Sequence, residues 1–370
     1  MSNSWYQINN IDELDSPALV IYPDRVRENI QTAIDMVGDP QRLRPHVKTH
    51  KTKEATQLML AAGITKFKCA TIAEAEMLAL CEAPDVLLAY QPIGPKLKRF
   101  VQLTQQYPRT QFSCLIDNTA AAVAIAKAFA EVGGVIPVYI DLNIGQNRTG
   151  IAPGEKANQL YNYCAQLTGL AITGLHAYDG HIREKDIAAR TAASDAAFAA
   201  VLAMQQTLQS MGYTDLIIIA GGSPTFPIHA KRASVECSPG TFVFWDYNYS
   251  DQCPEQPFKV AALVITRVIS LPADHLICVD LGHKSIAAEN EIGKRVYFLD
   301  TPPLIPVGQS EEHLVLDAGQ SHSFKTGDVL YGIPHHVCPT IALYDRAYTV
   351  ENGAVTGEWK IVARDRKISL

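Results

Sequence analysis

Short runs rich in β-branched residues alternate with longer alanine-rich segments from about residue 18 to about residue 246 of this 370-residue chain. Segments such as KEATQLMLAAG and TAAAVAIAKAFAEVGG have helical character and separate most of the strand-like runs. The pattern predicts eight strands, in the order RLRPHVK, KFKCAT, DVLLAY, QFSCLID, VIPVYIDLN, LAITGLHAY, LIIIAGG and SVECSPGTFVFW. Eight strands alternating with helices favour an α/β fold of the parallel (β/α)8 TIM-barrel type.

The main alternative is a doubly wound open sheet, but the chain lacks a G-x-G-x-x-G after its first strands. After residue 250, runs such as KVAALVITRVISL and EWKIVAR follow one another with turn residues between them and no convincing long helix. We therefore expect a barrel over residues 16–250 and a mostly β second domain over residues 251–370. Residues 1–15 are expected to associate with that second domain.

Charge and composition exclude several classes of function. The net charge of −6 and the pI near 6.0 argue against nucleic-acid binding, which needs a dense cationic face. The amino terminus has neither a cationic start nor an apolar run, and we expect no membrane span further along. A cytoplasmic protein is expected. Scattered cysteines inside strand-like runs, such as Cys69, Cys114 and Cys278, are expected to be buried free thiols.

The first expected strand ends in a run of basic residues from Arg44 to Lys51. A solvated surface loop is the ordinary interpretation of such a run. However, the carboxyl ends of barrel strands surround the active site, and alternation along the strand places Arg44, His46 and Lys48 on one face. A lysine among other cations in a cavity has a lowered pKa, which suits it to form an imine with an aldehyde cofactor and to move a proton. Lys48 is therefore a candidate catalytic residue.

The fifth and sixth expected strands also end in residues with chemical potential. Arg148 follows the fifth strand in a glycine-containing loop and could donate to a phenolate or carboxylate oxygen, although a loop salt bridge explains it nearly as well. Tyr178 follows the sixth strand and could lie against a flat ring, although a buried, hydrogen-bonded tyrosine would look the same.

The last two strands run into loops that could bind a phosphate group. The seventh is followed by Gly-Gly-Ser-Pro-Thr at residues 221–225, and the eighth contains Ser-Pro-Gly-Thr at residues 238–241. In this fold the loops after strands seven and eight often bind phosphate through backbone amides and hydroxyl groups. Each loop alone is also ordinary turn chemistry, so their joint placement is the stronger indication.

In the expected β domain, His336 and Cys338 are two residues apart and would lie on the same side of an extended segment. Imidazole and thiolate are good zinc ligands, and a pair leaves coordination positions open for water or substrate. A short His-x-Cys also occurs often by chance, so spacing alone leaves metal binding open.

Together these segments resemble the D-serine dehydratase and D-threonine aldolase family, within the pyridoxal 5′-phosphate (PLP) enzymes that share the alanine-racemase fold. The resemblance covers nearly the whole chain, and its most specific element is R-P-H-x-K-T-H-K at residues 44–51. It implies that Lys48 holds PLP as a Schiff base and that His336 and Cys338 bind a divalent metal, zinc being expected. It also implies that the other residues around the cofactor are His46, Arg148, Tyr178, Ser223, Thr225, Gly240 and Thr241.

Two departures separate the chain from alanine racemases themselves. Those enzymes carry an arginine just before the Pro-Gly of the eighth strand, where this chain has Ser238, and no K-x-N-x-Y-G follows Lys48. The resemblance therefore implies a PLP- and metal-dependent lyase acting on β-hydroxy D-amino acids. A D-serine dehydratase-like ammonia-lyase is expected, because aldolases of this family tend to show an acidic residue in place of Cys338. The alternatives are a D-threonine aldolase, an amino-acid racemase and a PLP-binding protein without turnover. Relatives pair as dimers, so a homodimer is expected.

Overall fold

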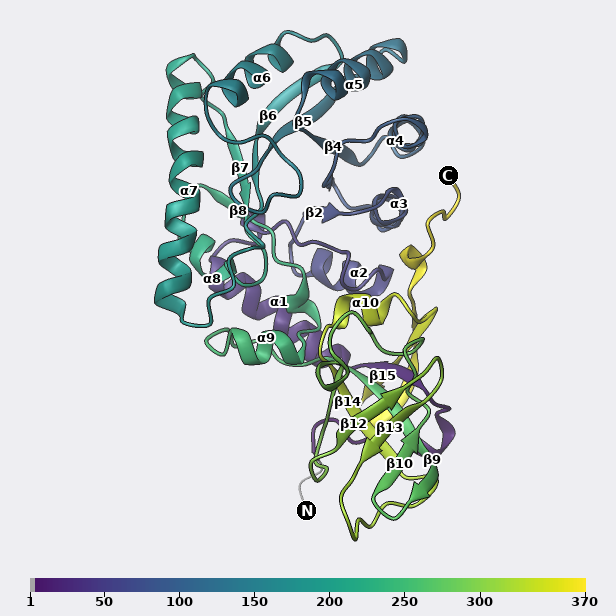
Figure 1. Ribbon diagram of the computed structural model, residues 1–370. Helices are drawn as coiled ribbons and strands as arrows, with labels where there is room; N and C mark the ends of the chain where they lie inside the picture. The colour runs from purple at the N-terminus through teal and green to yellow at the C-terminus, as the bar shows by residue number, and fades with distance from the viewer. Residues whose placement is uncertain (1–3) are drawn as a thin grey trace. The chain divides into compact units, whose positions relative to one another are not determined.

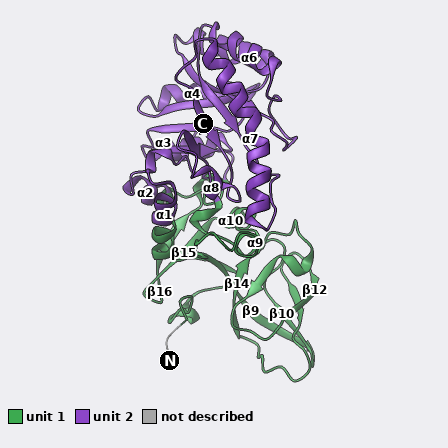
Figure 2. Cartoon of the chain, turned by 90° about the vertical axis from the view of Figure 1, so that its left-hand side faces the viewer, with its two compact units in different colours: residues 1–30, 49–55, 241–364 green, residues 31–48, 56–240, 365–370 purple. Residues whose placement is uncertain are grey.

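The computed structural model describes residues 4–370, which fall into two compact units (Figure 2). The first, called the β unit below, comprises the chain up to residue 30, residues 49–55 and residues 241–364. The second, called the barrel unit, comprises residues 31–48, 56–240 and 365–370. The domain boundaries expected from the sequence stay a prediction, and residues 1–3 of the expected amino-terminal segment lie outside the described residues.

The barrel unit is built on a seven-stranded parallel sheet in which every strand pairs with the next in sequence (Figure 1). Its strands are β2 (Lys66–Cys69), β3 (Asp85–Leu88), β4 (Gln111–Ile116), β5 (Ile136–Leu142), β6 (Leu170–Ala177), β7 (Ile217–Ala220) and β8 (Val235–Cys237). The sequential order follows from the short helical connections, which return the chain to the same side of the sheet each time. This is the alternating α/β architecture expected from the sequence.

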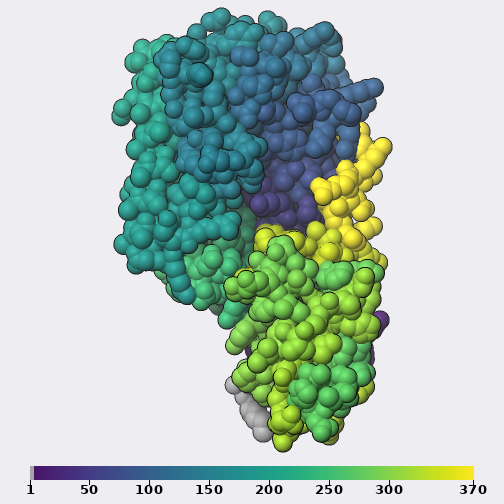
Figure 3. Space-filling view, viewed as in Figure 1, coloured from purple at the N-terminus to yellow at the C-terminus, as the bar shows by residue number. Residues whose placement is uncertain are grey.

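Helices connect these strands, and residues of this unit form the blue to teal part of the surface in the space-filling view (Figure 3). Several begin at a side-chain cap, as where Asn118 accepts a hydrogen bond from the amide of Ala121. The helix after β7 is only one turn long, in an interval that contains two prolines. The helices are α1 (Pro23–Val37), α2 (Lys53–Ala61), α3 (Ile72–Leu80), α4 (Pro95–Gln106), α5 (Thr119–Glu131), α6 (Glu155–Ala165), α7 (Ile187–Ser210) and α8 (Phe226–His229).

The segment expected to be the first barrel strand joins the two edges of this sheet. The amide of Arg44 donates to the carbonyl of Cys237 in β8 (2.8 Å), and the amide of Lys68 in β2 donates to the carbonyl of Pro45 (2.8 Å). The segment makes isolated parallel bridges at Leu43 and His46 rather than a regular strand, because Pro45 has no amide hydrogen to donate. It therefore takes the place of an eighth strand and closes the barrel.

Helix α7 corrects one expectation. By length and composition it could cross a membrane, whereas the sequence analysis expected no stretch of that length. A helix that covers the core of a globular domain passes the same test. The buried positions of α7 recur every three or four residues, which is the spacing of a single stripe packed against a sheet. These positions are Arg190, Ser194, Phe198, Val201, Met204 and Leu208.

The β unit contains a nine-stranded sheet with the path β12-β13-β10-β9-β1-β15-β16, and β14 pairs with both β9 and β11. Its strands are β1 (Ala18–Ile21), β9 (Ala262–Ala273), β10 (Leu276–Val279), β11 (Val296–Phe298), β12 (Ile305–Gln309), β13 (Leu314–Asp317), β14 (Val329–Pro334), β15 (Arg346–Glu351) and β16 (Ala354–Lys360). Its short helices are α9 (Tyr247–Gln252) and α10 (Val337–Ile341). The sequence near the amino terminus thus contributes β1 to a sheet otherwise formed by the carboxyl-terminal third.

Candidate active site

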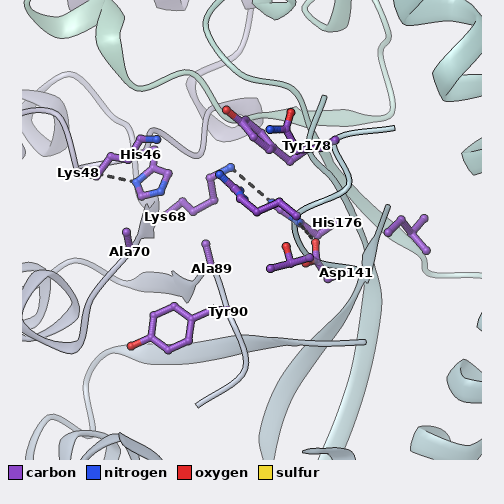
Figure 4. A pocket seen from close by; sticks show the side chains of 13 residues that line it. His46, Lys48, Lys68, Ala70, Ala89, Tyr90, Asp141, His176 and Tyr178 are labelled. Carbon is purple, nitrogen blue, oxygen red and sulfur yellow. Dashed lines mark hydrogen bonds and ion pairs between the residues drawn. The ribbon is translucent and has the colours of Figure 1, made fainter. Parts of the chain in front are cut away.

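A cavity of about 240 Å³ opens at the carboxyl ends of the barrel strands (Figure 4). This is the end of a (β/α)8 barrel at which active sites are built. All of its lining residues belong to the barrel unit. They come from the ends of the closing segment, β2, β3, β5 and β6, and are His46, Lys48, Lys68, Ala70, Ala89, Tyr90, Asp141, Leu142, Gln146, Arg148, Thr149, His176 and Tyr178.

Lys48 lines the cavity directly after the closing segment, where the sequence predicted it. Its side chain is exposed, and its backbone amide donates to Nδ1 of His46 (3.3 Å). Arg44, which alternation placed on the same face, lies lower in the barrel and is fully buried. There its guanidinium binds Asp85 (2.6 and 2.9 Å) and Glu236 (2.8 Å). The conspicuous basic run thus divides into a structural arginine and a lysine at the cavity.

Beneath Lys48, three polar side chains form a connected chain that the sequence analysis did not single out. Nδ1 of His176 lies 2.7 Å from Oδ1 of Asp141, and Nε2 of the same ring lies 3.5 Å from Nζ of Lys68. All three side chains are at least nine-tenths buried, and Figure 4 shows the lysine and the imidazole pointing toward one another. Asp141 and His176 lie near the ends of the fifth and sixth expected strands, but only the folded barrel brings them next to Lys68.

Burial and charge shift the pKa values in this chain. Burial and the neighbouring positive charge of Lys48 lower the pKa of Lys68 to about 7. Burial also lowers the pKa of His176, although its hydrogen bond to Asp141 opposes that shift. Burial would raise the pKa of Asp141, but the hydrogen bonds from His176 and Thr149 and the nearby positive charges together outweigh it, so the pKa is lowered. The imidazole is therefore neutral and Asp141 is a carboxylate at neutral pH.

Arg148 and Tyr178 lie together at the cavity, as both were predicted to approach one ligand. The guanidinium carbon of Arg148 is 5.0 Å from the centre of the Tyr178 ring, which is a cation–π distance. Gly180 makes room for the tyrosine, because a Cβ there would come within 2.1 Å of the Tyr178 hydroxyl oxygen. A flat ring and an arginine are thereby held side by side at the mouth of the barrel.

The residues predicted to bind a phosphate group are buried but do not line this cavity. After β7, the Thr225 hydroxyl donates to Asp179 (2.7 Å) and accepts from the amide of Gly222 (3.3 Å), so it organises its own loop. Gly221, with φ of +81°, allows the loop to pass close to His229. Phosphate binding by Ser223, Thr225, Gly240 and Thr241 stays a prediction.

The predicted metal ligands lie in the β unit, at the start of α10. Nδ1 of His336 is 2.6 Å from Oε1 of Glu289, so the outer nitrogen Nε2 is the one available for a metal. Asp246 holds this segment by accepting the amide of Val337 (3.1 Å). Sγ of Cys338 lies 3.2 Å from the hydroxyl oxygen of Thr49, the residue that follows Lys48 in the chain. Among residues 4–370 no group of three His, Cys, Asp or Glu side chains forms a complete metal cluster.

His50, in the same basic motif, leads to a prediction about pH. It is buried, and this burial lowers its pKa to about 3. In the unfolded chain the His50 imidazole is protonated below about pH 6.5, whereas in the folded chain it is protonated only near pH 3. Stability is therefore lost as the pH falls from 6.5 to 3. We expect the free energy of unfolding to fall between pH 6.5 and pH 5 more steeply than in His50→Gln, by up to about 1.4 kcal/mol per pH unit. Urea unfolding at several pH values measures both slopes, and equal slopes would contradict the assignment.

The cavity fits an anionic aromatic aldehyde. It is lined by three basic side chains, Lys48, Lys68 and Arg148, against one carboxylate that is already paired with a histidine. Oε1 of Gln146 is buried there with no hydrogen-bond partner among the described residues, so it can accept from a ligand. These residues suit PLP, with its phosphate and phenolate charges and its aldehyde, and Lys48 is the exposed amine of the cavity that would form the imine.

A closed barrel with an exposed lysine lining a cavity at its carboxyl end, in a chain that also carries a β unit, is the architecture of the barrel PLP enzymes with the alanine-racemase fold. Residues 21–248 match the family "Alanine racemase, N-terminal domain", and residues 261–350 match the "Putative serine dehydratase domain" family. The chain therefore belongs to the alanine-racemase family, in the branch of D-serine dehydratases and D-threonine aldolases, which are PLP-dependent lyases.

The similarity extends over whole chains. A D-threonine aldolase of Arthrobacter sp. is 28% identical over 95% of this chain and 93% of its own. A D-threo-3-hydroxyaspartate dehydratase of Delftia sp. is 26% identical over 90% of this chain and 93% of its own. The crystal structure of D-threonine aldolase from Filomicrobium marinum has a TM-score of 0.88 and 27% identity, covering 98% of this chain and 99% of that one. These matches confirm the predicted fold class and family.

Proposed function

We propose that this protein is a PLP-dependent lyase that acts on a β-hydroxy D-amino acid and eliminates its hydroxyl group, yielding a 2-oxo acid and ammonia. The observation that carries this proposal is the pair His336 and Cys338 in the β unit, where His336 is oriented by Glu289 and Cys338 is within hydrogen-bond distance of Thr49. The thiol favours dehydration over aldol cleavage, because the aldolases of the family tend to have an acidic residue at that position. D-Serine is the first substrate to test.

PLP, when bound, supplies a conjugated ring system that makes the proton on the substrate's Cα acidic. Lys48 would anchor the cofactor, and its amine in the cavity would take up the α-proton of the bound substrate. Arg148 can hold an anionic oxygen of the ligand, because its guanidinium is fixed against Tyr178. Elimination across Cα and Cβ then needs assistance for the departing hydroxide.

His336 and Cys338 would hold the metal that assists this departure, with zinc fitting an imidazole and a thiolate. A zinc ion there would act as a Lewis acid toward a β-hydroxyl group. Two protein ligands leave positions for water and substrate. The hydrogen bond from His336 to Glu289 supports this role, since histidine ligands commonly donate their second nitrogen to a carboxylate that orients the ring.

The Glu289 contact predicts the strength of metal binding. We expect Glu289→Gln to weaken zinc affinity by about 10- to 100-fold, because the amide no longer accepts the imidazole proton as a charged partner. Competition with a chromophoric chelator measures this affinity, and Cys338→Ala should lose the site. Glu291→Gln, two residues away on the same loop, is the matched control and should bind zinc as the parent does. Equal affinity in Glu289→Gln and the parent would contradict the metal assignment.

A second candidate is retro-aldol cleavage of the same substrate class to glycine and an aldehyde. The 28% identity to a D-threonine aldolase favours it. It would require a base to remove the β-hydroxyl proton, after which the Cα–Cβ bond breaks in place of the Cβ–O bond. The same metal and the same lysine would serve both reactions, so the products decide between them.

The test incubates the PLP- and zinc-loaded enzyme with D-serine and with D-threonine and measures 2-oxo acid, ammonia, glycine and aldehyde separately. Equal amounts of 2-oxo acid and ammonia are expected from dehydration. Glycine and aldehyde without 2-oxo acid would overturn the dehydratase proposal in favour of the aldolase. Interconversion of the alanine enantiomers, unaffected by a chelator, would indicate a racemase. An absorbance band of bound cofactor without any turnover would indicate a binding protein.

A further inference from the structure

Lys68 is the second lysine of the cavity, and the proposed reaction does not use it. It is the third of the four residues of β2 and is 2% exposed, so it is an amine enclosed by the barrel at the level of the cofactor pocket. Its Nζ lies 3.5 Å from Nε2 of His176 and 5.7 Å from the centre of the Tyr178 ring. Burying an ammonium group away from water is costly unless its charge has a use.

The hydrogen bonds decide which group carries protons in this chain. Because the carboxylate of Asp141 can only accept, Nδ1 of His176 must donate to it. The neutral ring then has a lone pair on Nε2, which accepts from the ammonium of Lys68. The imidazole thus favours the ammonium form of Lys68, while the carboxylate of Asp141 fixes the tautomer of the imidazole. The arrangement holds one exchangeable proton at Nζ.

Opposing charges surround that proton. Lys48 on the closing segment and Arg148 on the loop after β5 disfavour the ammonium form of Lys68, and burial acts in the same direction. The groups that favour it are Asp141 at the end of β5 and Asp179 after β6. His46, Tyr178 and His176 are the other titratable groups that line the same cavity. Near neutral pH a small change in local charge therefore converts this amine to an ammonium.

We propose that Lys68, oriented by His176 and Asp141, is a proton-exchanging cation of the cavity, and that it takes up a proton when an anionic ligand such as the PLP ring enters. An incoming phosphate, phenolate or carboxylate adds negative charge within the enclosed space and stabilises the ammonium form. Lys68 is then a positioning residue for the anion. It differs from Arg148, which is charged at all relevant pH values.

Anion binding in the cavity is coupled to proton uptake by Lys68. In the empty cavity the pKa of Lys68 is lowered to about 7, and a bound anion raises this pKa. Ligand binding therefore takes up a proton at pH values that lie between the pKa of the empty cavity and that of the occupied cavity. Affinity for an anion must therefore fall as the pH rises through this window. We expect the dissociation constant to increase by about 10-fold between pH 6.5 and pH 8.5, with uptake of about half a proton or more at pH 7.5.

The experiment uses the full-length apoprotein and pyridoxine 5′-phosphate, the alcohol analogue of PLP, which cannot form an imine with Lys48. Titration calorimetry in two buffers of different ionisation enthalpy counts the protons taken up at pH 7.5, and binding at pH 6.5 and pH 8.5 gives the affinity change. In Lys68→Arg the proton uptake due to residue 68 should vanish, and so should the part of the pH dependence of the affinity that residue 68 causes. This variant should still bind pyridoxine 5′-phosphate at pH 8.5. Lys68→Met should bind weakly at both pH values. Inorganic phosphate alone, titrated in the same way, separates a response to the phosphate group from a response to the ring.

Lys66 provides the matched control, because it lies two residues earlier on the same strand and pairs with Glu236 away from the cavity. Lys66→Met should leave proton uptake and its pH dependence as in the parent. Proton uptake in Lys68→Arg equal to that of the parent would overturn the proposal, as would equal pH dependence in Lys68→Met. The inference rests on this cavity being the cofactor site, so failure of pyridoxine 5′-phosphate to bind would overturn both. If pyridoxine 5′-phosphate causes the expected proton uptake but PLP forms its imine with a residue other than Lys48, only the assignment of Lys48 is overturned.

Discussion

Lys48→Ala is expected to lose the visible absorbance band of imine-bound PLP and to lower lyase activity by about 10³-fold. Alanine removes both the amine that anchors the cofactor and the amine proposed to take the α-proton. The cavity itself should persist, because Lys48 is exposed and the closing segment is held through backbone hydrogen bonds on both sides. The variant should therefore fold and still bind pyridoxine 5′-phosphate.

The measurement must also identify the lysine that forms the imine, since Lys68 lines the same cavity. Borohydride reduction of the PLP-loaded parent followed by peptide mass spectrometry should place the modification on Lys48. Lys53→Ala, at the start of α2 in the same stretch of chain, is the matched control and should retain band and activity. A retained band in Lys48→Ala, or modification of Lys68 in the parent, would refute the assignment of Lys48.

Arg44→Met is expected to lower the free energy of unfolding by about 3–5 kcal/mol, which is typical for removing one partner of a buried ion pair. Arg44 is fully buried and makes two hydrogen bonds to Asp85 and one to Glu236. Without it, Glu236 still has Lys66, whereas Asp85 loses its paired cation. Chemical denaturation of the apoprotein, followed by circular dichroism, measures the loss.

A second variant separates the missing charge from a change in packing. Arg44→Met combined with Asp85→Leu should recover part of the stability, because the unpaired carboxylate is removed together with its partner. Arg346→Met, which breaks an ion pair between half-exposed side chains, is the surface control and should shift the midpoint far less. Equal stabilities of Arg44→Met and the parent would show that the pair at the base of the barrel is dispensable.

The alternation of strands and helices predicted most of the barrel, because each strand is short, apolar and bounded by turn residues or helix caps. Lys48, His46, Arg148 and Tyr178 were found because strand ends can be located in the sequence, and the carboxyl ends of barrel strands meet at one place. Their convergence on one cavity is confirmed by the structure. The first barrel strand was harder to predict, because the segment around Pro45 forms only isolated β-bridges and no regular strand.

Other parts of the site depend on contacts between residues distant in sequence. Lys68 stands in a run, KFKC, that has the pattern of an ordinary short strand, and its partner His176 is 108 residues away. Alternation placed Arg44 on the same face as Lys48, but four residues along an extended chain span roughly 13 Å, enough to move from one end of a barrel to the other. A basic side chain inside the strand between two hydrophobic positions was the available signal for Lys68.

The sequence by itself determined the class of fold and the family, and it singled out Lys48 as the lysine predicted to form the imine, because these depend on local periodicity and on one short motif. Only the tertiary structure decided which charged residues share a buried space. It sent Arg44 to an ion pair at the base of the barrel and brought Lys68 to His176 and Asp141. The physical reason is that the energy of a charge depends on burial and on neighbours within a few ångströms, and in a barrel these neighbours come from different strands.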